Sequence, residues 1–150
     1  MPTATETRAS GFLKEALREI HIMAGLDPTS PSKQGTRKPL SVGVTSPDFG
    51  DGKTTVSIAL ASSLAEDFSA TVTLVDADFH THSVGREYGL QGQEGLSEVL
   101  AGNVTLQAVT HRVTEAKMSI VTAGKTPSDP ARMARSEHLT TLIENMKRAN

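Results

Sequence analysis

The sequence contains no cysteine and no tryptophan, and aromatic residues make up only 3% of its 150 positions. Without cysteine there is no disulfide framework, no thiolate metal site and no cysteine nucleophile. No run of about 18 apolar residues is present that could span a membrane, and the polar N-terminus lacks the apolar segment of a signal peptide. We therefore expect a cytoplasmic protein whose core is built from aliphatic residues.

Charge is unevenly distributed along the chain. Residues 41–130 contain five lysine or arginine residues against eleven aspartate or glutamate residues, a net charge of −6. The segments 1–40 and 131–150 each carry a net charge of +2. A nucleic-acid-binding surface needs a basic face, so the acidic centre argues against a nucleic-acid partner.

Hydrophobic spacing predicts an α/β fold. Aliphatic and β-branched residues predict strands at 40–45, 71–75 and 118–121. Apolar spacing of three and four residues, together with the Asp129-Pro130 pair, predicts helices at about 12–24, 53–67 and 95–101, from 130 onwards, and through 139–146. The succession of strand 40–45, helix 53–67 and strand 71–75 is typical of a βαβ unit. We therefore expect a parallel sheet with helices on both faces.

The clearest motif is the glycine-rich segment 46–55, which reads S-P-D-F-G-D-G-K-T-T. Between a strand and a helix, such a loop presents backbone N–H groups to a polyphosphate at the positive end of the helix. We predict that Lys53 reaches the β- and γ-phosphates and that the Thr54 hydroxyl ligates Mg²⁺. The predicted nucleotide-binding residues are Gly50, Asp51, Gly52, Lys53, Thr54 and Thr55.

Two carboxylates follow the predicted strand 71–75. Asp76 and Asp78 are expected at the carboxyl edge of the sheet, where the glycine-rich loop also lies. Carboxylates there can hold Mg²⁺, directly or through water, or accept a proton from an attacking hydroxyl. His80 and His82 have a spacing that could hold a metal, but their polar surroundings favour solvated side chains.

The run from Leu40 to Leu100 resembles the bacterial tyrosine kinases (BY-kinases) of capsular and exopolysaccharide synthesis, which belong with the MinD/ParA-like P-loop ATPases. The similar segments are 46–55 as Walker A, L-V-D-A-D at 74–78 as Walker A′, and G-L-S-E-V-L-A-G at 95–102. A weaker similarity covers V-T-A-G-K-T-P-S-D-P at 121–130. In the first helix, Glu15, Arg18 and His21 resemble the E-x-x-R-x-x-R oligomerisation motif of the family.

The sequence departs from the family pattern at several points. Pro47 stands where the phosphate-loop pattern begins with a small residue, and Phe79 to His82 stand where the family often has arginine. His21 replaces the last arginine of the oligomerisation motif. The family continues with a strand carrying the Walker B aspartate, so we expect a P-loop NTPase fold that lacks its C-terminal part. Residues 1–39 are expected to form an N-terminal helix and linker, and 40–150 an incomplete nucleotide-binding domain.

The resemblance implies an ATP-binding protein that uses Mg²⁺ and transfers the γ-phosphate to protein tyrosine, with Lys53, Asp76 and Asp78 as catalytic residues. It further implies homo-oligomers formed through Glu15, Arg18 and His21, a membrane polysaccharide co-polymerase as partner, and a position in the cytoplasm or at the inner face of the membrane. Two alternatives stay open. One is a non-catalytic ATP-sensing module for that co-polymerase. The other is a MinD/ParA-like ATPase, which is disfavoured because Asp48 occupies the position of the signature lysine of that group.

Overall fold

The computed structural model describes residues 15–17, 19–20, 39–67, 71–113 and 117–149. Its elements, in chain order, are α2 (Lys53–Asp67), β1 (Val72–Val75), α3 (Ser83–Glu87), α4 (Leu96–Leu100), the 3₁₀ helix η1 (Leu106–Val109), β2 (Thr110–Val113), β3 (Met118–Val121), α5 (Pro130–Ala134) and α6 (Glu137–Ala149). The predicted helices over 53–67 and 95–101 and the predicted strands over 71–75 and 118–121 are therefore confirmed.

The three strands form one sheet in the order β1-β3-β2. β1 and β3 are parallel, with Leu74 opposite Ile120, whereas β2 and β3 are antiparallel. The two predicted strands β1 and β3 are therefore parallel, as expected, and the sheet is mixed because the strand β2, which was not predicted, joins it in antiparallel orientation. The carboxyl ends of β1 and β3 lie at the same edge, so the segments that follow Val75 and Val121 emerge side by side.

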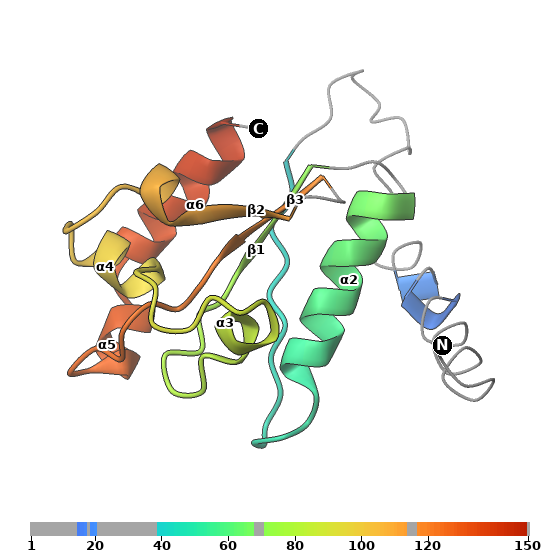
Figure 1. Cartoon of the computed structure of the whole chain (residues 1–150), viewed down its shortest axis with the longest axis horizontal. Helices are drawn as coiled ribbons and strands as arrows, with labels where there is room; N and C mark the ends of the chain where they lie inside the picture. Colours follow the sequence, from blue (N-terminus) through green and yellow to red (C-terminus); the bar gives the residue numbers. More distant parts are fainter. Residues whose placement is uncertain (1–14, 18, 21–38, 68–70, 114–116, 150) are drawn as a thin grey trace.

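Helices cover both faces of the sheet, as predicted. Met118 and Ile120 of β3 belong to a buried cluster with residues of α2 and α3, whereas Val121 and Ala123 belong to a second cluster with residues of α4. Strand side chains point to opposite faces in alternation, which explains this division. Leu139 and Leu142 of α6 and Met133 of α5 pack against the second cluster. Figure 1 accordingly shows α2 on one side of the strands and α4, α5 and α6 on the other.

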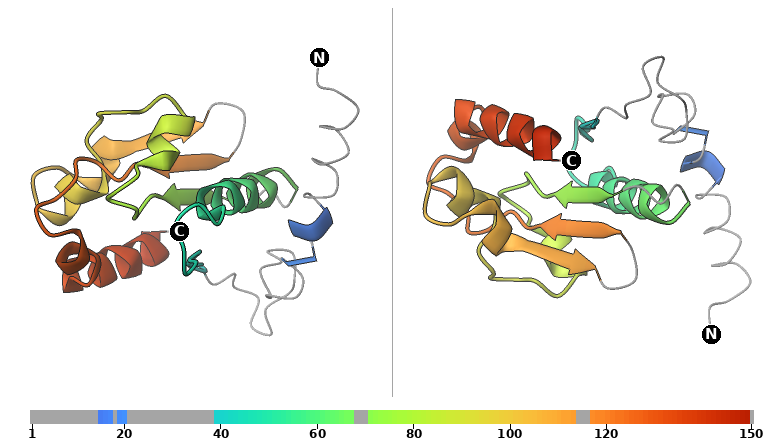
Figure 2. Two further views of the ribbon diagram at one scale, coloured as in Figure 1. Left: turned by 90° about the horizontal axis from the view of Figure 1, so that it is seen from below. Right: turned by 90° about the horizontal axis from the view of Figure 1, so that it is seen from above.

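The predicted strand over 40–45 is not formed, and this prediction was wrong. The side chains of Leu40 and Val42 are 63% and 49% exposed, and within the described residues β1 has only β3 as a hydrogen-bonded neighbour. Aliphatic residues favour an extended backbone, but a strand also needs a partner to satisfy its N–H and C=O groups. The predicted βαβ unit is therefore absent, and the parallel connection runs instead from β1 to β3 through α3, α4, η1 and β2 (Figures 1 and 2).

Few features of the predicted N-terminal helix and linker lie within the described residues. Residues 15–17 and 19–20 are helical, and Leu17 is buried. The rest of the predicted helix 12–24 and most of the linker lie outside the described residues. Among the described residues, none of the helices has the length and apolarity that crossing a membrane requires.

Candidate nucleotide-binding site

The glycine-rich loop runs directly into α2 and is held by hydrogen bonds of its own. Gly50 and Gly52 have φ angles of 86° and 85°, in the left-handed region that favours glycine. The Ser46 hydroxyl donates to the carbonyl oxygen of Asp48 (3.0 Å), and the Asp48 amide donates to Oδ2 of Asp51 (3.1 Å). The Asp51 side chain is therefore part of the internal bracing of the loop.

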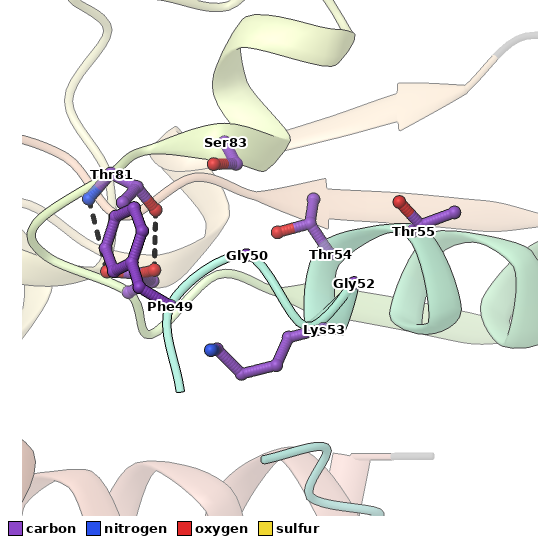
Figure 3. A pocket seen from close by; sticks show the side chains of 9 residues that line it. Phe49, Gly50, Gly52, Lys53, Thr54, Thr55, Thr81 and Ser83 are labelled. Atoms are coloured by element: carbon purple, nitrogen blue, oxygen red, sulfur yellow. Dashed lines mark hydrogen bonds between the residues drawn. The ribbon is translucent and has the colours of Figure 1, made fainter. Parts of the chain in front are cut away.

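Lys53, the first residue of α2, turns its side chain back across the loop. Its Nζ donates to the Ser46 hydroxyl oxygen (2.8 Å) and to the Asp48 carbonyl oxygen (2.9 Å). Figure 3 shows the side chain returning past Gly50 towards the start of the loop. The ammonium group thus lies against two oxygens of the loop, and an incoming phosphate would offer it stronger, charge-assisted acceptors.

Asp76 follows β1 and is almost fully buried, with 6% of its surface exposed. Its two carboxylate oxygens accept hydrogen bonds from the amides of Asp78 (3.0 Å) and Val84 (3.3 Å). Burial raises the pKa of Asp76, and these amide bonds only partly offset that effect. Asp76 therefore ties the end of β1 to the start of α3.

Asp78 has the opposite electrostatic character. Burial acts to raise its pKa, but the Thr81 hydroxyl (2.5 Å) and the amides of His80 (3.1 Å) and Thr81 (3.2 Å) outweigh it, so the pKa of Asp78 is lowered. The carboxylate is therefore ionised at neutral pH. It also organises the turn that leads into α3.

One pocket of about 240 Å³ brings the loop and Asp78 together. The predicted residues that line it are Gly50, Gly52, Lys53, Thr54, Thr55 and Asp78. The predicted site residues Asp51 and Asp76 are not in its lining. Sequence reasoning missed Phe49, Thr81 and Ser83, which also line this pocket (Figure 3). Thr81 and Ser83 could have been predicted from the sequence, because they closely follow Asp78, whose carboxylate organises the turn into α3.

The oxygen atoms that line this pocket suit a Mg²⁺–nucleotide complex. Mg²⁺ prefers oxygen ligands, and commonly takes one or two from the protein and the rest from phosphates and water. The Thr54 hydroxyl and the Asp78 carboxylate both line the pocket. In the described part of the chain, no three His, Asp or Glu side chains gather in a way that could bind a metal alone.

The predicted oligomerisation residues are only partly described. Glu15 is exposed on the short helical segment. Arg18 and His21 lie outside the described residues, so the predicted interface remains a prediction.

A glycine-rich loop that opens a helix, with an ionised aspartate from a strand end in the same pocket, defines the class of P-loop nucleotide-binding domains. Known structures agree with this class. The chain superimposes on the VpsO kinase domain with a TM-score of 0.63 and 29% identity, covering 67% of this chain and 49% of that one. It superimposes on the kinase domain of the Escherichia coli tyrosine kinase ETK with a TM-score of 0.62 and 27% identity. That match covers 67% of this chain and 39% of the ETK chain.

Curated proteins give the same relationship. The tyrosine-protein kinase CpsD of Streptococcus agalactiae is 30% identical over 105 residues, which make up 69% of this chain and 45% of CpsD. Ptk of Acinetobacter johnsonii, also named a tyrosine-protein kinase, is 30% identical over 95 residues, which make up 63% of this chain and 13% of Ptk. No family model matches the sequence. The chain is thus a homologue of the bacterial tyrosine kinases, and spans less than half the length of these two relatives.

Proposed function

We propose that this chain binds Mg·ATP in the pocket between the glycine-rich loop and Asp78 and transfers the γ-phosphate to a protein tyrosine. The observation that carries the proposal is the presence of Lys53, Thr54 and Asp78 in one pocket at the carboxyl edge of the sheet. The similarity to proteins named tyrosine-protein kinases supports the choice of tyrosine as acceptor. By the same resemblance, we propose a role in polysaccharide synthesis or export beside a membrane co-polymerase.

Different residues of the chain bind the phosphates, neutralise charge and accept the proton. The amides around Gly50 and Gly52 cradle the β-phosphate, and Lys53 neutralises charge on the transferring group. The Thr54 hydroxyl would hold Mg²⁺, whose chemistry is to offset charge on the phosphate oxygens. Asp78 would either complete that magnesium site or accept the tyrosine proton, and we propose the second role. The tyrosine oxygen bonds to the γ-phosphorus, the bond to the β–γ bridging oxygen breaks, and ADP leaves. The hydroxyl proton passes to the Asp78 carboxylate, which the Thr81 hydroxyl and the amides of the turn hold in position.

The test is phosphotyrosine formation by the full chain with Mg·ATP and a tyrosine-containing peptide. We expect Lys53→Met to reduce the rate by about a hundredfold or more, as losing a charge that stabilises the transition state does in other enzymes. Lys117→Met is the matched control, because Lys117 is exposed and does not line the pocket. Equal phosphotyrosine formation by Lys53→Met and the unmodified chain would refute the assignment.

A second candidate, an ATP-sensing module without transferase activity, is favoured by one observation. All four carboxylate oxygens of Asp76 and Asp78 already accept hydrogen bonds from the turn after β1 and the first residues of α3. For such a sensing module, we expect Mg·ATP to bind and Lys53→Met to abolish that binding, while neither phosphotyrosine nor free phosphate accumulates. Release of phosphate without phosphotyrosine would instead indicate a MinD/ParA-like ATPase.

A further inference from the structure

A second pocket, of about 420 Å³, lies beside the nucleotide pocket. Thr81 lines both pockets, and the residues that follow it divide between them, with Ser83 in the first and His82 in the second. The far wall of the second pocket is the segment 122–126, which follows β3. Since β1 and β3 are parallel, this segment and the turn after Asp78 emerge at one edge of the sheet.

The lining of this second pocket is basic, although it lies in the acidic part of the sequence. Arg86 and Lys125 contribute cationic side chains, and both residues are exposed. Gln91, Gln93 and three threonines add amide and hydroxyl groups, and none of the described residues in the lining is an aspartate or glutamate. Residues 41–130 nevertheless have a net charge of −6. Such a basic pocket in an acidic segment favours an anionic ligand.

Internal contacts fix the walls of the pocket. His82 has a φ of 51°, and it is the one residue other than glycine with a positive φ in the described part of the chain. Backbone strain of this kind is concentrated at functional sites. Nε2 of His82 lies 3.4 Å from the Thr126 hydroxyl oxygen, a contact that joins the two walls.

The far wall is held from behind by a buried carboxylate. Glu98 accepts hydrogen bonds from the amides of Gly95 (2.8 Å) and Lys125 (3.2 Å), which fixes the backbone from which the Lys125 side chain projects. On the near wall, Nη2 of Arg86 donates to the Thr81 carbonyl oxygen (2.6 Å), so the guanidinium is held at the boundary between the two pockets. Hydrogen bonds therefore fix the guanidinium of Arg86 and the backbone of Lys125.

We propose, building on the proposed kinase function, that this second pocket binds an acidic segment of the polypeptide that carries the acceptor tyrosine. Carboxylates of that segment pair with Arg86 and Lys125, and its backbone and amides meet Gln91 and Gln93. The tyrosine then crosses the shared boundary at Thr81 and presents its hydroxyl to Asp78. Arg86 and Lys125 are thus specificity-determining residues, outside the phosphate-binding loop.

The test uses the full chain without ATP and a labelled peptide in which a single tyrosine is flanked by glutamates. A second peptide, with glutamine in place of every glutamate, is the neutral probe. Fluorescence anisotropy should show binding of the acidic peptide about tenfold tighter, and the preference should shrink as salt is raised. The double variant Arg86→Gln, Lys125→Gln should bind both peptides equally.

A matched double variant, Arg112→Gln with Arg135→Gln, removes two exposed cations that do not line the pocket. It should keep the preference for the acidic peptide. Lys125→Gln alone leaves the hydrogen bond between Arg86 and Thr81 in place. Its preference for the acidic peptide should fall about threefold. This single variant tests the pocket even if the double variant does not fold. Equal binding of the two peptides by the unmodified chain would overturn the inference, as would a preference that survives the double variant.

This readout separates the inference from the proposed function. A chain that prefers the acidic peptide but forms no phosphotyrosine supports the pocket assignment and contradicts the kinase proposal. A chain that phosphorylates tyrosine with no preference for acidic flanks supports the kinase proposal and contradicts the pocket assignment.

Discussion

At the residue scale, Asp76 and Asp78 show how environment gives two neighbouring carboxylates different roles. Burial dominates at Asp76 and raises its pKa, whereas hydrogen bonds from Thr81 and His80 prevail over burial at Asp78 and lower its pKa. Only Asp78 lines the nucleotide pocket. In the proposed reaction it is therefore Asp78 that meets the substrate, whereas Asp76 holds the turn on which Asp78 lies through the amides of Asp78 and Val84.

Glu98 leads to a prediction about pH. Burial acts to raise its pKa, but the Gly95 amide, the Ser97 hydroxyl and the Lys125 amide outweigh it and lower the pKa. A lowered pKa means that the ionised form stabilises the folded state at neutral pH, and that this contribution is lost as the pH falls below about 4.3 towards the folded-state pKa. Urea unfolding at pH 7 and pH 3.5 should show a smaller loss of unfolding free energy for Glu98→Gln than for the unmodified chain. An equal loss for both would show that Glu98 makes no such contribution.

Gly95 leads to a prediction about packing. A Cβ at this position would collide with the carbonyl oxygen of Thr122 and approach the amide nitrogen of Gly124 to 2.5 Å. Because both are backbone atoms, Gly95→Ala should reduce the free energy of unfolding by about 2–4 kcal/mol. Gly43→Ala is the control, since a Cβ there meets no atom within 4 Å, and its effect should stay within about 0.5 kcal/mol. Similar stabilities for the two variants in chemical unfolding would contradict this account.

At the element scale, short segments marked by a local signal were predictable from sequence, and those that depend on distant neighbours were not. The strand Met118–Val121 has three apolar residues, all of them buried, and the helix Pro130–Ala134 begins at an Asp-Pro pair. By contrast, Thr110–Val113 contains His111 and Arg112, and becomes a strand only through its pairing with β3. The segment 40–45 has a strand-like composition but lacks a partner among the described residues. In the nucleotide pocket, Gly52 and Lys53 were predictable because they form a local sequence motif. Thr81 and Ser83 were missed, because only the turn after β1 brings them to this pocket.

The start of α5 gives a prediction at this scale. The Asp129 side chain accepts a hydrogen bond from the Arg132 amide (2.9 Å), and Pro130 occupies the first turn of the helix. Asp129→Ala should reduce the free energy of unfolding by about 1 kcal/mol, because the cap bond is lost. Asp129→Asn keeps a capping oxygen and should recover most of that loss. Urea unfolding of the two variants checks this, and an unrecovered loss in Asp129→Asn would argue against a capping role.

At the scale of the whole molecule, the parallel pairing of β1 and β3 places both pockets at one edge of the sheet. The two buried clusters, one on each face, hold that sheet between α2 with α3 and α4 with α6. The glycine-rich loop, the turn after Asp78 and the segment 122–126 are thereby brought together from separate parts of the chain. This arrangement supports a nucleotide in the first pocket and an acceptor chain in the second.

The proposed function depends on the glycine-rich loop binding the phosphates of Mg·ATP through Lys53. The most direct measurement is equilibrium binding of Mg·ATP to the full chain and to Lys53→Ala, with Lys117→Ala as the matched control. We expect saturable binding that adds about 2.7 kcal/mol to the folding stability at a ligand concentration of 100 times Kd. Lys117→Ala should bind equally well, and Lys53→Ala should not bind detectably over the same concentrations. A folded unmodified chain that binds no Mg·ATP, or an affinity that is unchanged in Lys53→Ala, would show that the loop does not bind the phosphates through Lys53.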